Sequence, residues 1–289
     1  MNRVLAIGVL ALAASAVPSR AAPLPTTCVT TDQLRWTPER PSSGTLFRVH
    51  LADRSLVATV QVAGEPLHFG AGEDSASALA AVPIDSAGGV TLKWTCRDGQ
   101  TGARRIPARS GAYALERLRV APRFSAPPDS ALAQRMRHEA ERAAAVSRAA
   151  HHTPRLWKGS FTVPRASRIT SRFGGGRTFN GTVTSRHMGT DYAGAVGAPV
   201  RAVNRGVVRL VGRFYLGGNV IYLDHGEGLV SAYLHLSRHQ VAEGDTVERG
   251  DVIGRVGATG RVTGPHLHFI ARYGQITVDP ASLFAVRAQ

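Results

Sequence analysis

The second half of the chain consists of short β-branched runs that alternate with glycine-containing turns. From residue 161 onward, no stretch shows a convincing helical pattern. The expected strands lie at residues 168–173, 206–211, 219–224, 229–236, 252–256 and 266–273. Short strands at this spacing predict an all-β fold, namely a glycine-rich antiparallel β-sandwich or barrel over residues 161–285.

An earlier region of the chain has a related pattern. Short alternating runs at residues 46–51, 56–62 and 90–94 are separated by turn-forming stretches. They predict a small β-sandwich-like accessory domain over residues 23–121. We find no candidate chemistry there, and we interpret His50 and His68 as structural or surface residues.

A helical connector is expected between these regions, over residues 122–160. Three prolines between residues 122 and 128 end the first region, and Asp129 can cap a helix that runs to about residue 150. Leu132, Met136 and Ala140 recur at four-residue spacing and predict its packed face. His151 and His152 follow the helix, and we expect a pair at this place to be solvated.

The first 22 residues are typical of a secretory signal peptide. Arg3 precedes an apolar run over residues 4–17, and residues 19–21 offer a small-x-small cleavage site. The run is short and alanine-rich for a membrane span, which needs about 20 residues, so an uncleaved anchor is the less favoured alternative. We therefore expect an exported protein, periplasmic or associated with the cell wall, and not integral to a membrane after cleavage.

The two cysteines, Cys28 and Cys96, both lie in the first third of the chain. An exported chain meets an oxidising compartment, so a disulfide between them is expected, with two free thiols as the alternative. Neither cysteine is near a histidine cluster, so we do not count them as metal ligands.

The strongly basic charge indicates an anionic partner. Lys and Arg total 35 against 20 acidic residues, a net charge of +15, which becomes 15 − 2 = +13 without Arg3 and Arg20. Nucleic acid, anionic lipid and an acidic wall polymer would all fit this charge. Export makes nucleic acid the least favoured of the three.

Polar residues that can bind metal recur in three stretches of the predicted β domain. His266 and His268 fall on one face of an expected strand, because side chains alternate there. His187 and Asp191, four residues apart in a glycine-containing loop, can face one centre. His235 ends another strand, with Ser231 and Tyr233 expected on its own face.

These five residues exceed the needs of a catalytic zinc site by two. Such a site takes three nitrogen or oxygen ligands from the protein and leaves a fourth position open. The two remaining imidazoles could accept a proton from water and stabilise an oxyanion, as amide hydrolysis requires. A set of two imidazoles and one carboxylate, without sulfur, favours Zn²⁺ over other metals.

The ordered motifs resemble those of the lysostaphin-type, or LytM-domain, zinc metallopeptidases. They are His-x-Gly-x-Asp at residues 187–191, Tyr-x-His-Leu at 233–236 and Gly-Pro-His-Leu-His-Phe at 264–269. Flanking segments at residues 169–174, 180–181, 197–203, 218–220, 224–226 and 257–265 also resemble this family. The likeness covers residues 161–283. Some members place a tyrosine near the metal, but the glycine-rich loop at residues 174–186, which we expect to be flexible, has none.

The resemblance implies a zinc-dependent endopeptidase that hydrolyses peptide bonds in bacterial peptidoglycan, in a cross-bridge or stem peptide. The resemblance also implies one Zn²⁺ per chain, bound by His187, Asp191 and His268. It implies proton transfer and oxyanion stabilisation by His266 and His235. Asn180 would contact substrate or water, and His225 would have a structural role.

Two alternatives belong to other classes of protein. A non-enzymatic or autoinhibited LytM-like module could bind the wall and regulate another hydrolase, but such modules usually lack metal positions that are present here. The turns at residues 241–257 resemble those of biotinyl or lipoyl carriers, which need a lysine that this region lacks.

The accessory region could block the cleft, dock a wall-associated regulatory protein, or position the enzyme on the wall.

Overall fold

The computed structural model describes residues 28–29, 33–53, 55, 57–70, 77–86, 88–111, 113–124, 126–181 and 183–286. The expected signal peptide, residues 1–22, lies outside these ranges. Most regular structure in the described part is β-strand, and nearly all the strand pairs are antiparallel, which confirms the all-β expectation. None of the helices in these ranges is long and apolar enough to cross a membrane.

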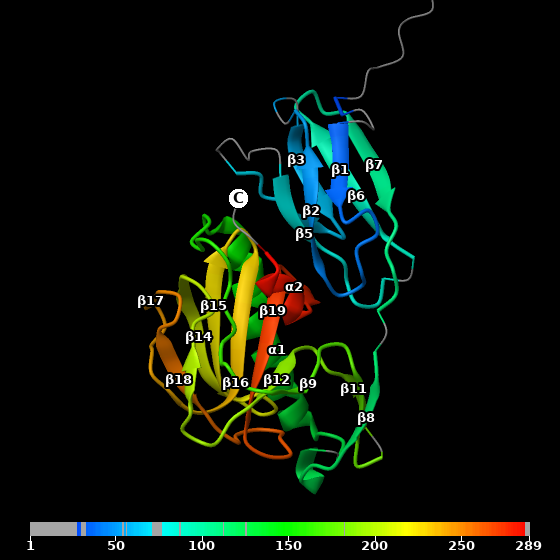
Figure 1. Cartoon of the computed structure of the whole chain (residues 1–289). Helices are drawn as coiled ribbons and strands as arrows, with labels where there is room; N and C mark the ends of the chain where they lie inside the picture. Colours follow the sequence, from blue (N-terminus) through cyan, green and yellow to red (C-terminus); the bar gives the residue numbers. More distant parts are fainter. Residues whose placement is uncertain are drawn as a thin grey trace, which may run out of the picture.

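Two small sheets form the N-terminal region (Figure 1). One has the order β1 (Leu34–Thr37), β2 (Leu46–Leu51), β5 (Ser77–Ala81), and the other β4 (Glu65–Pro66), β3 (Val57–Val62), β6 (Val90–Cys96), β7 (Thr101–Ile106). Alternation along β6 buries Val90 and Leu92 between more exposed residues. A disulfide joins Cys28 to Cys96, whose Cα atoms are 6.0 Å apart.

The connecting helix α1 (Ser130–Ala149) begins where the sequence predicts, since the Asp129 side chain accepts a hydrogen bond from the Leu132 amide. Its packed face differs from the expected one. Ala143 and Val146 are buried against the C-terminal sheet, whereas Ala140 is exposed. The four-residue spacing was wrong for Ala140, whereas Leu132 and Met136 are half-buried. The reason is that the face that packs on the sheet in the second half of the helix is the one that carries Ala143 and Val146. A short 3-10 helix, η3 (Pro122–Phe124), precedes it, and another, η4 (Ala150–His152), follows.

A ten-stranded sheet forms the C-terminal region. Its main path is β17 (Thr246–Val247), β14 (Gly206–Phe214), β15 (Gly218–Gly226), β16 (Leu229–His239), β19 (His266–Tyr273), β12 (Thr190–Ala193) and β9 (Ile169–Ser171). Off this path, β18 (Val252–Val256) pairs with β16 and with β13 (Pro199–Arg201), and β20 (Ile276–Val278) pairs with β19. The short helix α2 (Pro280–Phe284) ends the described chain. The three longest strands, β14, β15 and β16, are consecutive in sequence and in space, and β16 carries this frame to β19.

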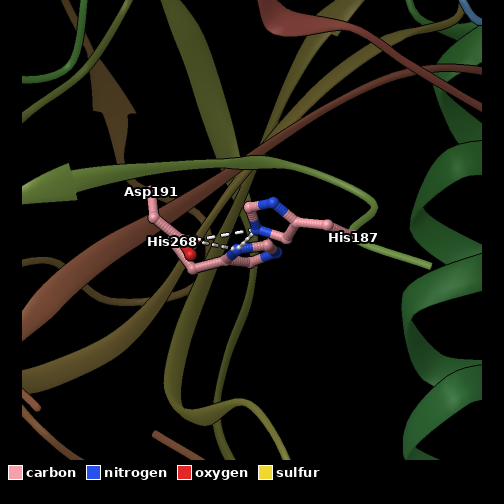
Figure 2. Close-up of side chains that lie close together, drawn as sticks. All are labelled: His187, Asp191 and His268. Atoms are coloured by element: carbon pink, nitrogen blue, oxygen red, sulfur yellow. Dashed lines mark hydrogen bonds and ion pairs between the residues drawn. The ribbon is translucent and has the colours of Figure 1, made fainter. Parts of the chain in front are cut away.

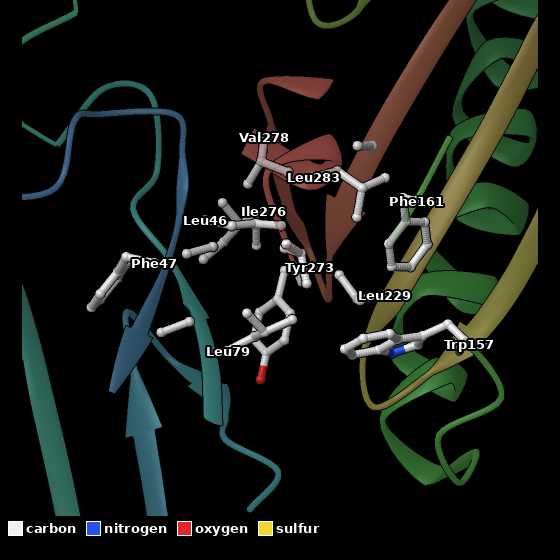
Figure 3. Close-up of a cluster of buried hydrophobic side chains, with 14 of the residues drawn as sticks. Leu46, Phe47, Leu79, Trp157, Phe161, Leu229, Tyr273, Ile276, Val278 and Leu283 are labelled. Atoms are coloured by element: carbon white, nitrogen blue, oxygen red, sulfur yellow. The ribbon is translucent and has the colours of Figure 1, made fainter. Parts of the chain in front are cut away.

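One hydrophobic core extends through both regions. Leu46 and Leu79 of the N-terminal sheets lie beside Ile276 and Leu283 of the C-terminal region (Figure 3). The Leu46 amide also donates a hydrogen bond to the Ser282 hydroxyl, at 3.1 Å. The expected domain limits at residues 121 and 160 stay predictions, but the apolar contact shows that the regions are packed together.

His151 contradicts the expectation of a solvated histidine pair. Its side chain is buried, with Nε2 2.8 Å from Glu65 Oε2 and Nδ1 2.8 Å from His68 Nε2. Burial lowers the pKa of His68 to about 4. His152 is exposed. The helix exit is buried because the N-terminal sheets pack over it, which no local pattern could reveal.

A further sheet, of three strands, connects the N-terminal region to the C-terminal one. Strand β8 (Leu115–Leu118) pairs in parallel with β10 (Gly176–Phe179), which pairs with β11 (Val183–Arg186). The segment expected to be a flexible loop is therefore largely a β-hairpin, to which β8 adds a strand.

His225 is a buried structural residue, as the sequence analysis expected. Its Nδ1 lies 2.7 Å from the Arg205 carbonyl, and its Nε2 lies 2.8 Å from the Ser231 hydroxyl, which is 3.1 Å from the Tyr233 hydroxyl. An N–H at Nδ1 and a lone pair at Nε2 satisfy these contacts, so the ring is neutral. Burial lowers the pKa of His225 to about 4.

We predict that His225 makes folding stability depend on pH. The unfolded histidine has a higher pKa, so the stabilisation is complete above about pH 6.5 and is lost as the pH falls toward 4, by roughly 3 kcal/mol. His225→Asn does not titrate, and its amide can still donate to the Arg205 carbonyl. Urea unfolding at pH 7, 5.5 and 4 should show the wild type more stable at pH 7 and the difference shrinking with acidification. A constant difference would contradict this account.

Candidate metal centre

Strand pairing brings two of the predicted ligands together. Asp191 on β12 lies directly opposite His268 on β19 in an antiparallel register. Opposite residues of such a pair project their side chains from the same face and are neighbours. The next pair on this face joins Ala193 to His266, so both histidines of the His-Leu-His motif face the same side.

The third residue, His187, reaches the pair from the segment between β11 and β12 (Figure 2). Its Nε2 lies 3.0 Å from Asp191 Oδ1 and 3.0 Å from His268 Nδ1, and the last two atoms are 2.6 Å apart. All three side chains are buried. One ligand atom from each lies within 4.8 Å of the others, so the three residues could hold a metal ion.

Backbone contacts orient His187 toward this centre. Its Nδ1 lies 2.8 Å from the Arg172 carbonyl and 2.9 Å from the Ser171 hydroxyl. Donation from Nδ1 leaves a lone pair on Nε2, as a metal ligand requires. Gly189 is needed for close approach, because a Cβ there would lie 2.5 Å from the Phe269 carbonyl oxygen and 2.7 Å from the His268 ring.

The charges in the centre favour a carboxylate at Asp191 beside a neutral imidazole at His268. Burial alone would raise the pKa of Asp191, but contacts with His187 and His268 outweigh it and hold that pKa well below its usual range. Burial lowers the pKa of His268 to about 4, despite the opposing effect of Asp191. This combination provides two nitrogen lone pairs and one negative charge for a cation.

His235 and His266 lie beside the three-residue cluster. Their ring centroids are 5.0 Å apart, and the His235 ring is 5.8 Å from that of His268. Nδ1 of His235 is 2.8 Å from the Thr259 carbonyl, and Nδ1 of His266 is 2.8 Å from the Gly264 carbonyl. Both rings can therefore donate from Nδ1 and keep an unprotonated Nε2.

A local irregularity of β16 places His235. The register shifts between Tyr233 and Leu236, and His235 has a φ of 62°, which is strained for a residue other than glycine. His235 lines the cavity, while Tyr233 is completely buried in the core. The expectation that the two share a face was wrong, because a β-bulge breaks the alternation.

The five residues surround one cavity of about 530 Å³, and Asn180 does not line it. The Asn180 side chain instead accepts a hydrogen bond from the Val120 amide at 3.0 Å and donates one to the Val120 carbonyl at 2.9 Å. Its expected contact with substrate or water stays a prediction.

Two further residues of the site had no signal in the sequence. Arg177 on β10 donates to Asp191 Oδ2 at 2.8 Å and to Glu116 Oε2 at 2.9 Å. Glu116, on β8, also accepts a hydrogen bond from the Ser171 hydroxyl at 2.7 Å. Hydrogen bonds from Ser171 and Arg177 lower the pKa of Glu116 despite its partial burial. Glu116, from the expected accessory region, thus supports Arg177, which in turn holds Asp191 through Oδ2, the oxygen that does not face His187 and His268.

Comparison with known proteins identifies the class of this fold and site. Residues 185–280 match the model of Peptidase family M23. Peptidoglycan DD-endopeptidase ShyC of Vibrio cholerae is 41% identical over 103 residues, 36% of this chain and 24% of that protein. DD-carboxypeptidase/endopeptidase Mpg of Neisseria meningitidis is 47% identical over 97 residues, 34% of this chain and 22% of that protein. The matches thus span about a quarter of the length of these curated relatives.

Residues 185–280 are therefore a Peptidase family M23 domain, which confirms the resemblance to lysostaphin-type peptidases, and His187, Asp191, His235, His266 and His268 all lie within it. The fold likeness extends further. A crystal structure of a Pseudomonas aeruginosa protein assigned to peptidase M23 has a TM-score of 0.65 and 26% identity, covering 86% of this chain and 96% of that one.

We predict that Glu116→Gln weakens metal binding at this centre. The change removes a negative charge near the cation and loosens Arg177, and both effects act in the same direction. Loss of such supporting contacts typically reduces metal affinity about 10- to 100-fold. Competition with a chromogenic chelator, titrating Zn²⁺ into the metal-free full chain, measures the change.

Glu141→Gln is the matched control, since Glu141 is exposed on α1 and paired with Arg148. It should bind Zn²⁺ as the wild type does. Equal Zn²⁺ affinity of Glu116→Gln and the control would show that the β8 strand does not support the centre.

Proposed function

We propose that this chain is a zinc-dependent endopeptidase that hydrolyses peptide bonds in bacterial peptidoglycan. The observation that carries the proposal is the convergence of His187, Asp191 and His268 on one point, beside two further imidazoles in the same cavity. The relatives named as peptidoglycan DD-endopeptidase and DD-carboxypeptidase/endopeptidase support the substrate class.

The donor set fits one Zn²⁺ ion. Tetrahedral ligands at bonds of about 2.0 Å stand roughly 3.3 Å apart, and the three donor atoms are separated by 2.6–3.0 Å. The three donor atoms would have to move apart by only a few tenths of an ångström, on the order of ordinary side-chain adjustment, to bind the ion. When bound, zinc lowers the pKa of a water molecule and polarises the scissile carbonyl.

His266 and His235 are the proposed proton-transfer residues. Nε2 of His266 lies 3.8 Å from Asp191 Oδ1, and in this proposal it accepts a proton from the attacking water. A ring protonated at Nε2 becomes an N–H donor, which can stabilise a carbonyl oxygen as it turns negative or protonate the leaving nitrogen. Burial, followed by the neighbouring His268 and His266, lowers the pKa of His235 to about 3, so its resting form is neutral and able to accept a proton.

We also propose export to the periplasm or cell wall, directed by the signal peptide at residues 1–22 and consistent with the Cys28–Cys96 disulfide. Under this proposal the N-terminal region either positions the enzyme on the wall or receives a wall-associated regulatory protein. A non-enzymatic module is less well supported, because all five site residues are present and share one cavity.

Two substitutions should separate metal binding from proton transfer. His268→Ala removes a proposed ligand, so metal binding and turnover should both be lost. His266→Ala leaves the three ligands in place and should retain the metal, with kcat falling about 100- to 10,000-fold. Metal content by atomic emission, and fragments of purified peptidoglycan by mass spectrometry with and without a chelator, measure the two effects. If His266→Ala cleaved at the parent rate, its proposed role would be wrong.

The positive charge should contribute to wall binding. Basic residues exceed acidic ones by 15, so binding to isolated sacculi should weaken as ionic strength rises from about 0.01 to 0.1 M, where the Debye length shortens from about 30 to 10 Å. Cosedimentation of metal-free protein with sacculi measures binding without cleavage. Unchanged binding over this range would exclude an electrostatic contribution.

A further inference from the structure

Arg261 lies where the catalytic cavity meets a second, apolar hollow. The catalytic cavity is lined by Arg261 and Phe179, and the guanidinium carbon lies 4.0 Å from the centre of the Phe179 ring. The apolar hollow, about 460 Å³, is lined by Arg261, Leu216 and Met136 among others. Leu216 also lines the catalytic cavity, so the two hollows share a wall.

Two other arginines that line this cavity have acidic partners, whereas the partly buried Arg261 has none among the described residues. Arg177 is paired with Glu116 and Asp191, and Arg186 is paired with Asp85. Burial lowers the pKa of Arg261, and repulsion from the charge of Arg177 lowers it further. No carboxylate offsets these two effects. A partly buried cation without a counter-charge carries an uncompensated desolvation cost, and a ligand carboxylate would remove it.

We propose that Arg261 binds a carboxylate of the substrate peptide and so selects peptides that carry a carboxylate near the scissile bond. The inference rests on the proposed peptidase function. The centre of the Phe179 ring lies 4.0 Å from the guanidinium carbon, and this cation–π contact limits the rotation of the Arg261 side chain. The N–H groups of the guanidinium remain free to donate to a ligand. A carboxylate can accept two parallel hydrogen bonds from them.

The position of Arg261 also suggests how the peptide continues. The apolar hollow beyond it is lined by the apolar side chains of Phe124, Leu132 and Met136, with Arg123 also on its wall. A chain anchored at Arg261 by its carboxylate would place the next group in this hollow. The preferred substrate is therefore an acidic peptide with an aliphatic group beside the carboxylate.

Two carboxylates of a peptide could fill this site, a side-chain carboxylate or the C-terminal one. A set of three synthetic peptides, identical around the cleaved bond, separates them: one with both carboxylates free, one amidated on the side chain, and one amidated at the C-terminus. The wild type should show a kcat/KM about 10- to 100-fold higher for the free peptide than for one of the amidated forms, the range expected for a charge-assisted hydrogen bond. The form that loses activity identifies the carboxylate.

Arg261→Gln should reduce the ratio of kcat/KM between the free and the amidated peptide to within about twofold. Arg261→Lys should leave an intermediate ratio, because lysine keeps the charge but cannot donate two parallel hydrogen bonds to a carboxylate. Arg168→Gln is the control. Arg168 lines the same cavity but is exposed, and the preference should persist in this variant. Thermal unfolding of each variant reports whether the fold is intact.

A second measurement does not depend on turnover. Calorimetry with the metal-free full chain should give tighter binding of the free peptide than of the selected amidated form, and Arg261→Gln should abolish the difference. Equal cleavage of all three peptides by the wild type, or a preference that survives Arg261→Gln, would overturn the inference and leave the peptidase function intact. Absence of cleavage with carboxylate-selective binding that needs Arg261 would overturn the function and support the inference.

Discussion

The pairing of β12 with β19 is the interaction on which the site depends. It sets Asp191 opposite His268, and a shift of one residue would turn one of the two side chains to the other face of the sheet. On the other edge of β19, pairing with β16 sets Leu234 opposite His268 and so brings His235 beside the same centre. The site is precise because three neighbouring strands of one sheet hold it, with His187 alone supplied by a connecting segment.

The electrostatics of the centre follow from burial. A carboxylate and two imidazoles out of contact with water form a strong site for a cation, but they need support to remain in place. Arg177 provides it by occupying the outer oxygen of Asp191, and Glu116 balances the charge of Arg177. This chain of contacts leads from the candidate metal centre to β8, which precedes the connecting helix, so the N-terminal region forms part of the site's structure.

The two regions also share apolar contacts at a distance from the site. Leu46 and Leu79 pack beside the last strand and helix of the C-terminal region (Figure 3). The buried His151 joins the contact through Glu65 and His68. A buried apolar interface of this kind favours a fixed arrangement of the two regions. The fold shared with the Pseudomonas aeruginosa structure over 86% of this chain is consistent with that arrangement.

The sequence alone was sufficient for the all-β class, the start of helix α1 and the members of the histidine and aspartate cluster. These features depend on local alternation, capping and ordered motifs, which are read along the chain. The tertiary structure decided what depends on distant segments. The bulge that turns His235 into the cavity arises from pairing with β15, and Arg177 and Glu116 meet Asp191 only because β8 joins the β10–β11 hairpin. Such contacts join residues up to 61 positions apart and leave no periodic trace in the sequence.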